Sequence, residues 1–134
     1  MPQFIIDSGA FLALLNAKDR FHPVAKQFAL ANREAVFFIP EFIFAETMTL
    51  IKARLGSRQA IQLGESIQAS AQFQLVPLTD DMRQVIWSLF SRYADKDWSY
   101  PDCSLLALAQ QMGVTAVFSF DHHIEQMAGL TRVP

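Results

Sequence analysis

The spacing of hydrophobic residues alternates along the chain between two patterns. Short apolar runs, as in residues 3–6 and 35–39, are typical of strands buried on both faces of a sheet. Longer stretches between them place apolar residues three or four positions apart, as helices with one buried face require. In chain order the pattern predicts strands at 3–6, 35–39, 73–76, 114–118 and 131–133, and helices at 8–16, 22–32, 40–55, 57–71, 80–93, 102–112 and 122–128.

Proline, glycine and threonine mark several of the predicted helix ends. Pro23 and Pro40 suit first turns, Thr79 is a side-chain cap, and Gly56 and Gly113 follow the last turns of their helices. Strands that alternate with helices favour a parallel sheet covered on both faces. We therefore expect an α/β fold, a three-layer α/β/α domain that spans residues 1–134 as a single unit. Ligands in such sheets bind beyond the carboxyl ends of the strands.

Composition and charge narrow the class of protein. The 134 residues are 51% apolar and 18% charged, which is ordinary for a globular chain. No apolar stretch is long enough for a membrane span, no signal segment opens the sequence, and Cys103 is the single cysteine, so we expect a cytoplasmic protein. The net charge of −2 means that bulk charge does not attract nucleic acid; a bound metal ion or a local basic patch would have to do so.

Three aspartates lie next to predicted strand ends and helix starts. Asp7 directly follows the first strand, Asp121 comes three residues after the strand at 114–118, and Asp102 begins the helix that leads into that strand. Each has a simple alternative explanation, because aspartate is a preferred helix cap. For Asp102 this alternative is a capping box that begins at Ser99.

Glu46 is harder to explain by local structure. It lies in the middle of the predicted helix at 40–55, and no basic residue stands three or four positions away. Helical spacing places it on an apolar face beside Phe42 and Leu50. An unpaired carboxylate there costs several kcal/mol, so a partner from elsewhere in the fold is expected. The alternative is a side chain at the edge of this face that reaches out to water.

Carboxylates that converge on one site repel one another unless a cation neutralises them. Oxygen ligands without a cysteine or histidine cluster suit Mg²⁺ or Mn²⁺. Such an ion can polarise a phosphodiester and stabilise charge on the leaving oxygen. If the four acidic side chains converge, the sequence therefore predicts metal-dependent cleavage of phosphodiester bonds.

Four segments together resemble the PIN domain family. They are residues 4–15, 40–47, 100–109 and 117–123, and their order and spacing cover essentially the whole chain. The size resembles that of the stand-alone PIN ribonucleases, the VapC-type toxins of toxin–antitoxin pairs. The resemblance implies a three-layer fold, dependence on Mg²⁺ or Mn²⁺, endonucleolytic cleavage of RNA and inhibition by a small antitoxin protein.

The resemblance also assigns roles to individual residues. Asp7 and Asp102 would be the direct metal ligands, Glu46 would complete the ligand shell or orient the attacking water, and Asp121 would bind metal or an outer water. Ser8 and Ser119 match positions whose hydroxyls support the site. In a departure from the family pattern, Pro101 stands where a hydroxyl residue often precedes the third acid, so we expect the loss of one cap.

Other polar residues have open interpretations. We expect His122 and His123 to point to different sides of their helix and therefore not to share one ion. Asp97 is either an extra acid at the rim of the pocket or, the interpretation we favour, a solvated loop residue. Cys103 is expected to be a packed small side chain.

Two surfaces also have open interpretations. The basic residues that follow Glu46 (Lys52, Arg54 and Arg58) either steer RNA phosphates toward the pocket or form an ordinary solvated face. The helix at 40–55 is apolar around much of its circumference, through Phe42, Phe44, Met48 and Ile51. That surface is either core or the interface of a homodimer or of an antitoxin peptide.

Two other functions compete with the ribonuclease. One is a PIN-like binding or scaffold module without turnover, against which the presence of all four acids argues. The other is a structure-specific DNA nuclease, which the lack of a DNA-binding appendage in 134 residues makes the weaker hypothesis.

Overall fold

The five predicted strands form one sheet in the computed structural model, which describes residues 1–134. The strands are β1 (Gln3–Ile6), β2 (Val36–Pro40), β3 (Phe73–Val76), β4 (Ala116–Phe118) and β5 (Thr131–Val133). Every neighbouring pair is parallel, and the order across the sheet is β3-β2-β1-β4-β5. β1 lies at the centre, where Ile5 pairs with Phe38 on one side and Val117 on the other.

Six α-helices and one short 3₁₀ helix connect the strands. They are α1 (Ser8–Leu15), α2 (His22–Ala31), α3 (Glu41–Leu55), α4 (Ser57–Ala69), α5 (Asp80–Arg92), α6 (Tyr100–Met112) and η1 (His122–Gln126). Each predicted helix is present, with ends that differ from the prediction by at most a few residues. None of these helices combines the length and the apolar character that a bilayer crossing requires.

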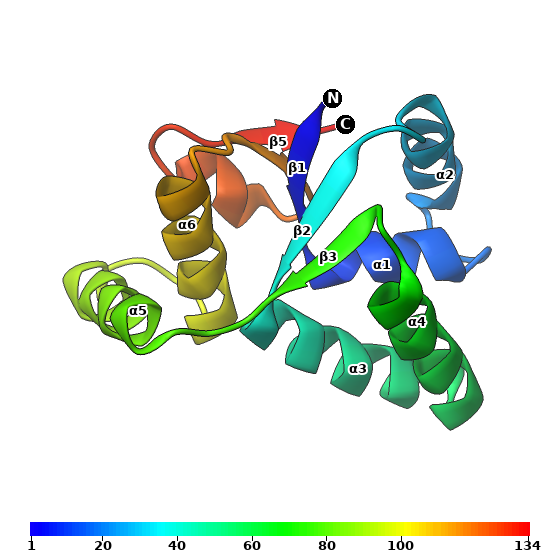
Figure 1. Cartoon of the computed structure of the whole chain (residues 1–134), viewed down its shortest axis with the longest axis horizontal. Helices are drawn as coiled ribbons and strands as arrows, with labels where there is room; N and C mark the ends of the chain where they lie inside the picture. Colours follow the sequence, from blue (N-terminus) through cyan, green and yellow to red (C-terminus); the bar gives the residue numbers. More distant parts are fainter.

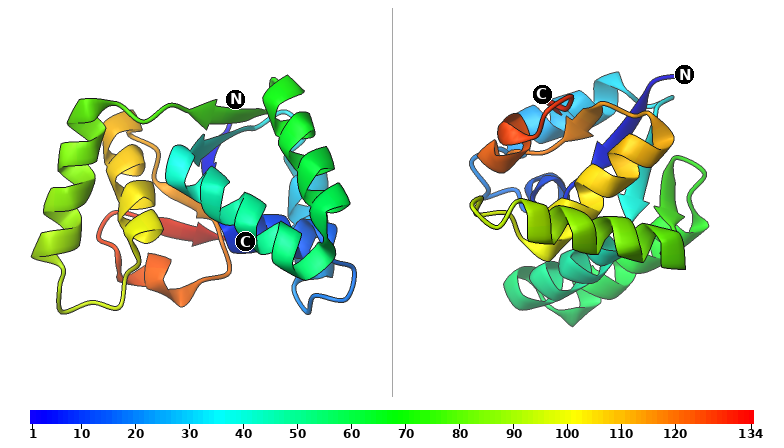
Figure 2. Two further views of the ribbon diagram at one scale, coloured as in Figure 1. Left: turned by 90° about the horizontal axis from the view of Figure 1, so that it is seen from below. Right: turned by 90° about the vertical axis from the view of Figure 1, so that its left-hand side faces the viewer.

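The helices cover both faces of the sheet, as the prediction of a three-layer α/β/α fold requires. Figure 1 shows α5 and α6 on one side of the strands and α1, α2 and α4 on the other. The left view of Figure 2 shows the same separation, with α3 packed beside α4. The helices α5 and α6 likewise pack against each other.

The hydrophobic core is centred on the middle strands. Ile5, Ile39, Val117 and Phe118 have no exposed surface, in agreement with the prediction of strands buried on both faces. Phe37 stacks on Phe4 and Phe73 of the neighbouring strands, with ring centroids 5.3 and 5.0 Å apart. Because all strands are parallel and packed in this way, their carboxyl ends are held at one edge of the sheet.

Candidate active site

A pocket of about 480 Å³ lies at the carboxyl edge of the sheet, and all four predicted acids line it. Asp7 follows β1, Glu46 comes from α3, Asp102 from the first turn of α6, and Asp121 from the segment after β4. Ser8 also lines the pocket. The fold therefore brings together residues that are up to 114 positions apart in the sequence.

Asp7 is the N-cap of α1 and is almost completely buried. Its side chain is 5% exposed. One carboxylate oxygen accepts a hydrogen bond from the Ser8 backbone N–H at 2.8 Å, and the other accepts one from the Ser119 hydroxyl at 3.0 Å. The Asp7 backbone N–H donates to the Phe118 carbonyl, which ties the residue to β4. The carboxylate is therefore held by the first residue of α1 and by the segment that follows β4.

Glu46 has the partner that its position in the helix requires. The Ser8 hydroxyl donates a hydrogen bond to Glu46 Oε1 at 2.5 Å, which joins α1 to α3. Glu46 is half-buried, and it lines the acidic pocket on one side and an open hollow beside Leu50 and Pro101 on the other. The contact is to a neutral hydroxyl, so the negative charge of Glu46 is still not balanced.

Asp102 is fixed by the capping box that the sequence suggested. Its backbone N–H donates to the Ser99 hydroxyl at 3.1 Å, and its Oδ2 accepts from the Ser99 N–H at 2.9 Å. Pro101 has no hydroxyl to offer, and the N-cap of α6 is Ser99. The helix consequently begins at Tyr100, two residues before the predicted start. Asp102 is the third residue of its first turn and is 8% exposed.

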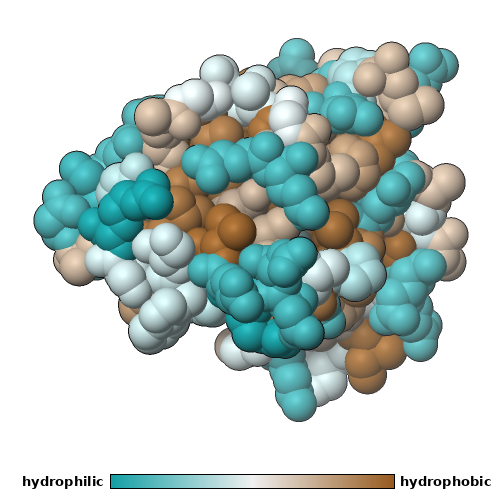
Figure 3. All heavy atoms as spheres, turned by 60° about the vertical axis from the view of Figure 1, so that its left-hand side comes forward, coloured by the Kyte–Doolittle hydropathy of each residue, from teal (hydrophilic) through white to brown (hydrophobic).

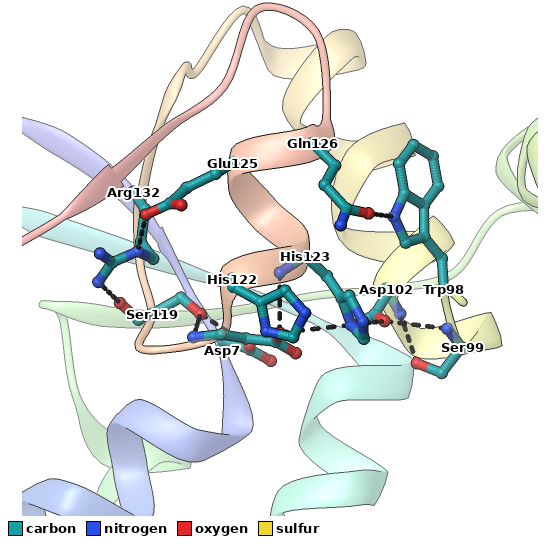
Figure 4. Close-up of polar contacts among 11 residues, drawn as sticks. Asp7, Trp98, Ser99, Asp102, Ser119, His122, His123, Glu125, Gln126 and Arg132 are labelled. Carbon is teal, nitrogen blue, oxygen red and sulfur yellow. Dashed lines mark hydrogen bonds and ion pairs between the residues drawn. The ribbon is translucent and has the colours of Figure 1, made fainter. Parts of the chain in front are cut away.

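Asp121 is linked to the same network through Ser119. Its backbone N–H donates to the Ser119 hydroxyl at 3.0 Å, and its Oδ1 accepts from the His123 N–H at 2.9 Å. The Nδ1 atom of His123 is 3.3 Å from the Asp121 carboxylate and 3.7 Å from that of Asp102. Figure 4 shows the contact between His123 and Asp102. His123 is thus a pocket residue as well.

The two histidines do not point to different sides, and that expectation is wrong. Their ring centroids are 4.4 Å apart, and the Asp121 carboxylate is 3.7 Å from Nδ1 of His122. The segment is a single 3₁₀ turn capped by Asp121, so both rings lie near the cap carboxylate. Asp121, His122 and His123 each have a ligand atom within 4.8 Å of the others, although His122 is exposed. The four carboxylates line the same pocket without forming so tight a cluster.

The charges of the pocket are not balanced by protein cations. None of the four carboxylates forms an ion pair with lysine or arginine; their only basic neighbours are His122 and His123. The pKa of Asp7 is raised to about 6, chiefly by burial and to a smaller extent by the charges of Asp102 and Glu46, against the lowering effect of its hydrogen bonds. Burial and the charge of Asp121 likewise raise the pKa of Asp102. The pocket is therefore an electrostatically strained acidic site.

Several pocket residues were not predicted as site residues. Asp19 and Phe21 line the pocket from the segment before α2, and Phe120 lines it from the segment after β4. From the sequence, the feature that could have identified Phe21 and Phe120 is that each aromatic residue stands close to an acidic residue. Asp97 also lines the pocket, as an extra acid at its rim would, and it is exposed, as a solvated loop residue would be. Cys103 is buried and packed, as predicted, and burial raises its thiol pKa.

The remaining surfaces lie outside the acidic pocket. Lys52, Arg54 and Arg58 are exposed around the turn between α3 and α4, and none of them lines the pocket. Phe44 and Met48 line a groove between α3 and α4, whereas Ile51 is core.

Figure 3 turns the α5 side of the molecule forward and shows hydrophobic patches among hydrophilic groups. The exposed apolar side chains of α5 are Val85, Trp87 and Phe90.

The fold and the pocket define a class: a three-layer α/β/α protein with acidic side chains from four segments at the carboxyl edge of a parallel sheet. The family model described as "PIN domain" matches residues 4–130. The chain belongs to the PIN domain family, as the sequence motifs predicted.

The chain is similar to a known endonuclease in both sequence and structure. The chain is 27% identical over 116 residues to the 23S rRNA-specific endonuclease VapC20 of Mycobacterium tuberculosis, and the match covers 87% of each protein. The crystal structure of VapC20, described as a toxin that cleaves the sarcin–ricin loop, superimposes with a TM-score of 0.87 at 25% identity over 97% of this chain and 98% of that one.

A second solved structure shows the fold alone. The DNA-bound VapBC of Salmonella typhimurium matches with a TM-score of 0.70 at 12% identity, covering 99% of this chain and 98% of that one.

Proposed function

We propose that this chain is a divalent-metal-dependent endoribonuclease and the toxin of a toxin–antitoxin pair. The observation that carries the proposal is the convergence of four carboxylates on one pocket that contains no lysine or arginine partner. The similarity to a 23S rRNA-specific endonuclease over most of both chains supports RNA as the substrate. Residues 1–134 would act as one PIN domain.

The donor set fits Mg²⁺ or Mn²⁺. Both ions prefer oxygen ligands, and the pocket offers carboxylate oxygens from Asp7, Glu46, Asp102 and Asp121. The raised pKa of Asp7 fits as well, because a nearby cation would compensate the cost of burying its charge. We assign Asp7 and Asp102 as direct ligands, Glu46 as the supporting carboxylate and Asp121 as the outer member.

A divalent cation in this pocket would polarise the scissile phosphodiester and stabilise charge on the leaving oxygen. The protein's own groups do the positioning. Ser8 holds Glu46 toward the pocket, where its carboxylate can orient the attacking water and accept a proton from it. Ser119 fixes the Asp7 carboxylate and the Asp121 backbone together, and the Ser99 capping box fixes Asp102. Each acid is thus oriented by a serine.

The proposed protein partners of this chain are based on the structural comparisons and on its exposed apolar surfaces. The structural neighbours include VapBC, whose fold this chain shares, so we propose a small antitoxin protein as its inhibitor. The apolar groove at Phe44 and Met48 and the exposed apolar residues of α5 offer surfaces for that protein and for a homodimer. We propose the cytoplasm as the site of action.

Cleavage of a synthetic hairpin with the sarcin–ricin loop sequence tests the function, beside single-stranded RNA and flap DNA. We expect cleavage of RNA that EDTA abolishes and Mn²⁺ or Mg²⁺ restores. Asp7→Asn should lower the rate by at least roughly 100-fold, more than the loss of an outer-shell partner. Asp81→Asn, at an exposed acid on α5, is the matched control and should cleave at the wild-type rate.

Three results would contradict this assignment. Full activity in the Asp7→Asn variant would remove Asp7 from the metal site. Cleavage of flap DNA without cleavage of either RNA would make the chain a DNA nuclease. A protein that neither cleaves nor shows a thermal shift with Mn²⁺ would be a binding module.

A further inference from the structure

Three side chains form a stacked column at the rim of the acidic pocket. The rings of Phe21 and Phe120 are nearly parallel, at an interplanar angle of 7°, with centroids 4.5 Å apart. The guanidinium carbon of Arg20 lies over the Phe21 ring, 4.4 Å from its centroid. Because Phe120 covers one face of Phe21, Arg20 covers the opposite face. Both phenylalanines line the pocket with the four carboxylates.

The column ends on a guanidinium that pairs with no other polar group of the protein. Arg20 is exposed, and it forms no ion pair and no hydrogen bond through its side chain. Phe21 and Phe120 are half-buried rather than fully enclosed. A column whose only purpose was packing would not need an exposed, unpaired guanidinium as its last layer.

Backbone contacts hold the column in a fixed position relative to the acids. The Asp19 carboxylate accepts a hydrogen bond from the Phe21 N–H at 2.8 Å, and the His22 ring contacts the Ala13 carbonyl at 2.7 Å. Phe120 stands between Ser119 and Asp121, which belong to the hydrogen-bond network around Asp7. The column and the acidic site therefore lie in neighbouring segments that hydrogen bonds hold in place.

Contacts that do not depend on attraction to phosphate would strengthen RNA binding beside an acidic pocket. The four carboxylates repel the RNA backbone wherever a cation does not neutralise them. Unpaired RNA bases stack on aromatic rings and on arginine guanidinium planes, and this interaction tolerates acidic surroundings because a base is neutral. Arg20 also adds a positive charge beside the base.

We propose that Arg20, Phe21 and Phe120 form a base-stacking site for an unpaired nucleobase of the RNA close to the scissile phosphate. This inference rests on the proposed ribonuclease function and deepens it. The base extends the column by stacking on the outer face of the Arg20 guanidinium, and Phe21 and Phe120 hold that plane in place. The column is a positioning element of the substrate site and takes no part in the chemical step.

Binding of the hairpin RNA described above, with 2-aminopurine placed at one unpaired position at a time, tests the proposal. The Asp7→Asn chain is used so that the RNA stays intact. We expect fluorescence quenching at one position, and its loss in Arg20→Lys, which keeps the charge but not the plane. Affinity should fall roughly 5- to 100-fold in Arg20→Lys and in Phe21→Leu, whereas Phe21→Tyr should bind normally.

Matched controls separate stacking from charge and from folding. Arg92→Lys changes an arginine over an aromatic ring, that of Tyr93, which does not line the pocket, and this variant should bind normally. Replacing the quenched base by an abasic site should weaken binding to the Asp7→Asn chain but not further weaken binding to its Phe21→Leu variant. Full binding by Arg20→Lys, with loss only in Arg20→Ala, would show charge steering and overturn the stacking site.

The two proposals fail in different ways. If the wild-type protein cleaves RNA and the column variants bind and cleave normally, the stacking site is wrong and the ribonuclease stands. If the wild-type protein cleaves no RNA but the column variants lose affinity and quenching, the stacking site stands and the ribonuclease is wrong.

Discussion

Asp7 combines near-complete burial, two hydrogen bonds and no cationic partner within the protein. Desolvation disfavours its charged form, whereas the Ser8 N–H and the Ser119 hydroxyl favour it. The balance leaves its pKa at about 6, so the carboxylate is mostly ionised at neutral pH at a cost in stability. A residue with this balance gains from a cation more than an exposed aspartate does.

Ser119→Ala tests how far the hydroxyl supports this charge. The hydroxyl donates to Asp7 and accepts from the Asp121 backbone, so its loss should raise the pKa of Asp7 further and loosen Asp121. We expect a loss of Mn²⁺ affinity of roughly 10- to 100-fold, measured by calorimetry. Ser104→Ala is the control, because Ser104 is also buried and donates one hydrogen bond, to the Pro101 carbonyl. Equal Mn²⁺ affinity in the two variants would exclude a supporting role for Ser119.

The acidic residues of the pocket could be identified from the sequence because of their positions relative to the predicted strands and helices. Asp7 and Asp121 follow strands whose carboxyl ends meet at one edge, and Glu46 lacked any local partner. His123 and Phe21 were not identified as pocket residues, because the directions of their side chains depend on a 3₁₀ turn and on an irregular segment before α2. Hydrophobic periodicity carries no information about such segments.

At the scale of elements, the first turn of α6 connects helix stability to the site. Ser99 and Asp102 satisfy each other's backbone N–H groups, so the residue that caps the helix also orients an acid of the pocket. In α5 the Thr79 side chain caps the helix in the same way, by accepting from the Met82 N–H, but no pocket residue takes part. The two helices therefore provide a matched pair of caps.

Ser99→Ala and Thr79→Ala should separate stability from metal binding. Each substitution removes one cap and should lower the free energy of unfolding by about 1 kcal/mol, measured by urea denaturation. Only Ser99→Ala should also weaken Mn²⁺ binding, because the first turn of α6 then holds Asp102 less firmly. Unchanged Mn²⁺ affinity in Ser99→Ala would show that the cap serves the helix alone.

The predicted elements were located correctly, and their ends were less accurate. Residues 114 and 115 were expected in β4, but the Val114 N–H still donates to the Ala109 carbonyl, after Gly113 has ended α6 in a left-handed conformation. The strand therefore begins at Ala116. Apolar runs locate an element, whereas its first and last residues depend on hydrogen bonds that composition does not show.

For the whole molecule, the strand order decides which residues meet. The sequence predicted a parallel sheet but not its order, since similar apolar runs leave the neighbours of each strand open. With β1 between β2 and β4, the carboxyl ends of three adjacent strands bring together Asp7, the start of α3 and the Ser119–Asp121 segment. The acidic pocket is thus a consequence of topology as much as of the acids themselves.

Because the acids are concentrated in one place, the stability of the metal-free protein should fall as the pH rises. The native state binds more protons than the unfolded chain between about pH 4 and 6, since the pKa of Asp7 is raised from 3.8 to about 6 and that of Asp102 is raised too. The free energy of unfolding should therefore be larger near pH 4.5 than at pH 7, with Asp7 alone contributing a difference of about 2 kcal/mol.

Urea denaturation across this pH range, with EDTA or with Mn²⁺, measures the effect. In Asp7→Asn the neutral amide removes the contribution of Asp7, so this variant should be more stable than the wild type at pH 7 without metal, whereas Asp81→Asn should keep the wild-type slope. Saturating Mn²⁺ should raise wild-type stability at pH 7, because the ion binds the ionised native pocket and not the unfolded chain. A metal-free stability that is flat or rises from pH 4.5 to pH 7 in the wild type would mean that burial does not strain these carboxylates, and the electrostatic argument for a cation in the pocket would fail.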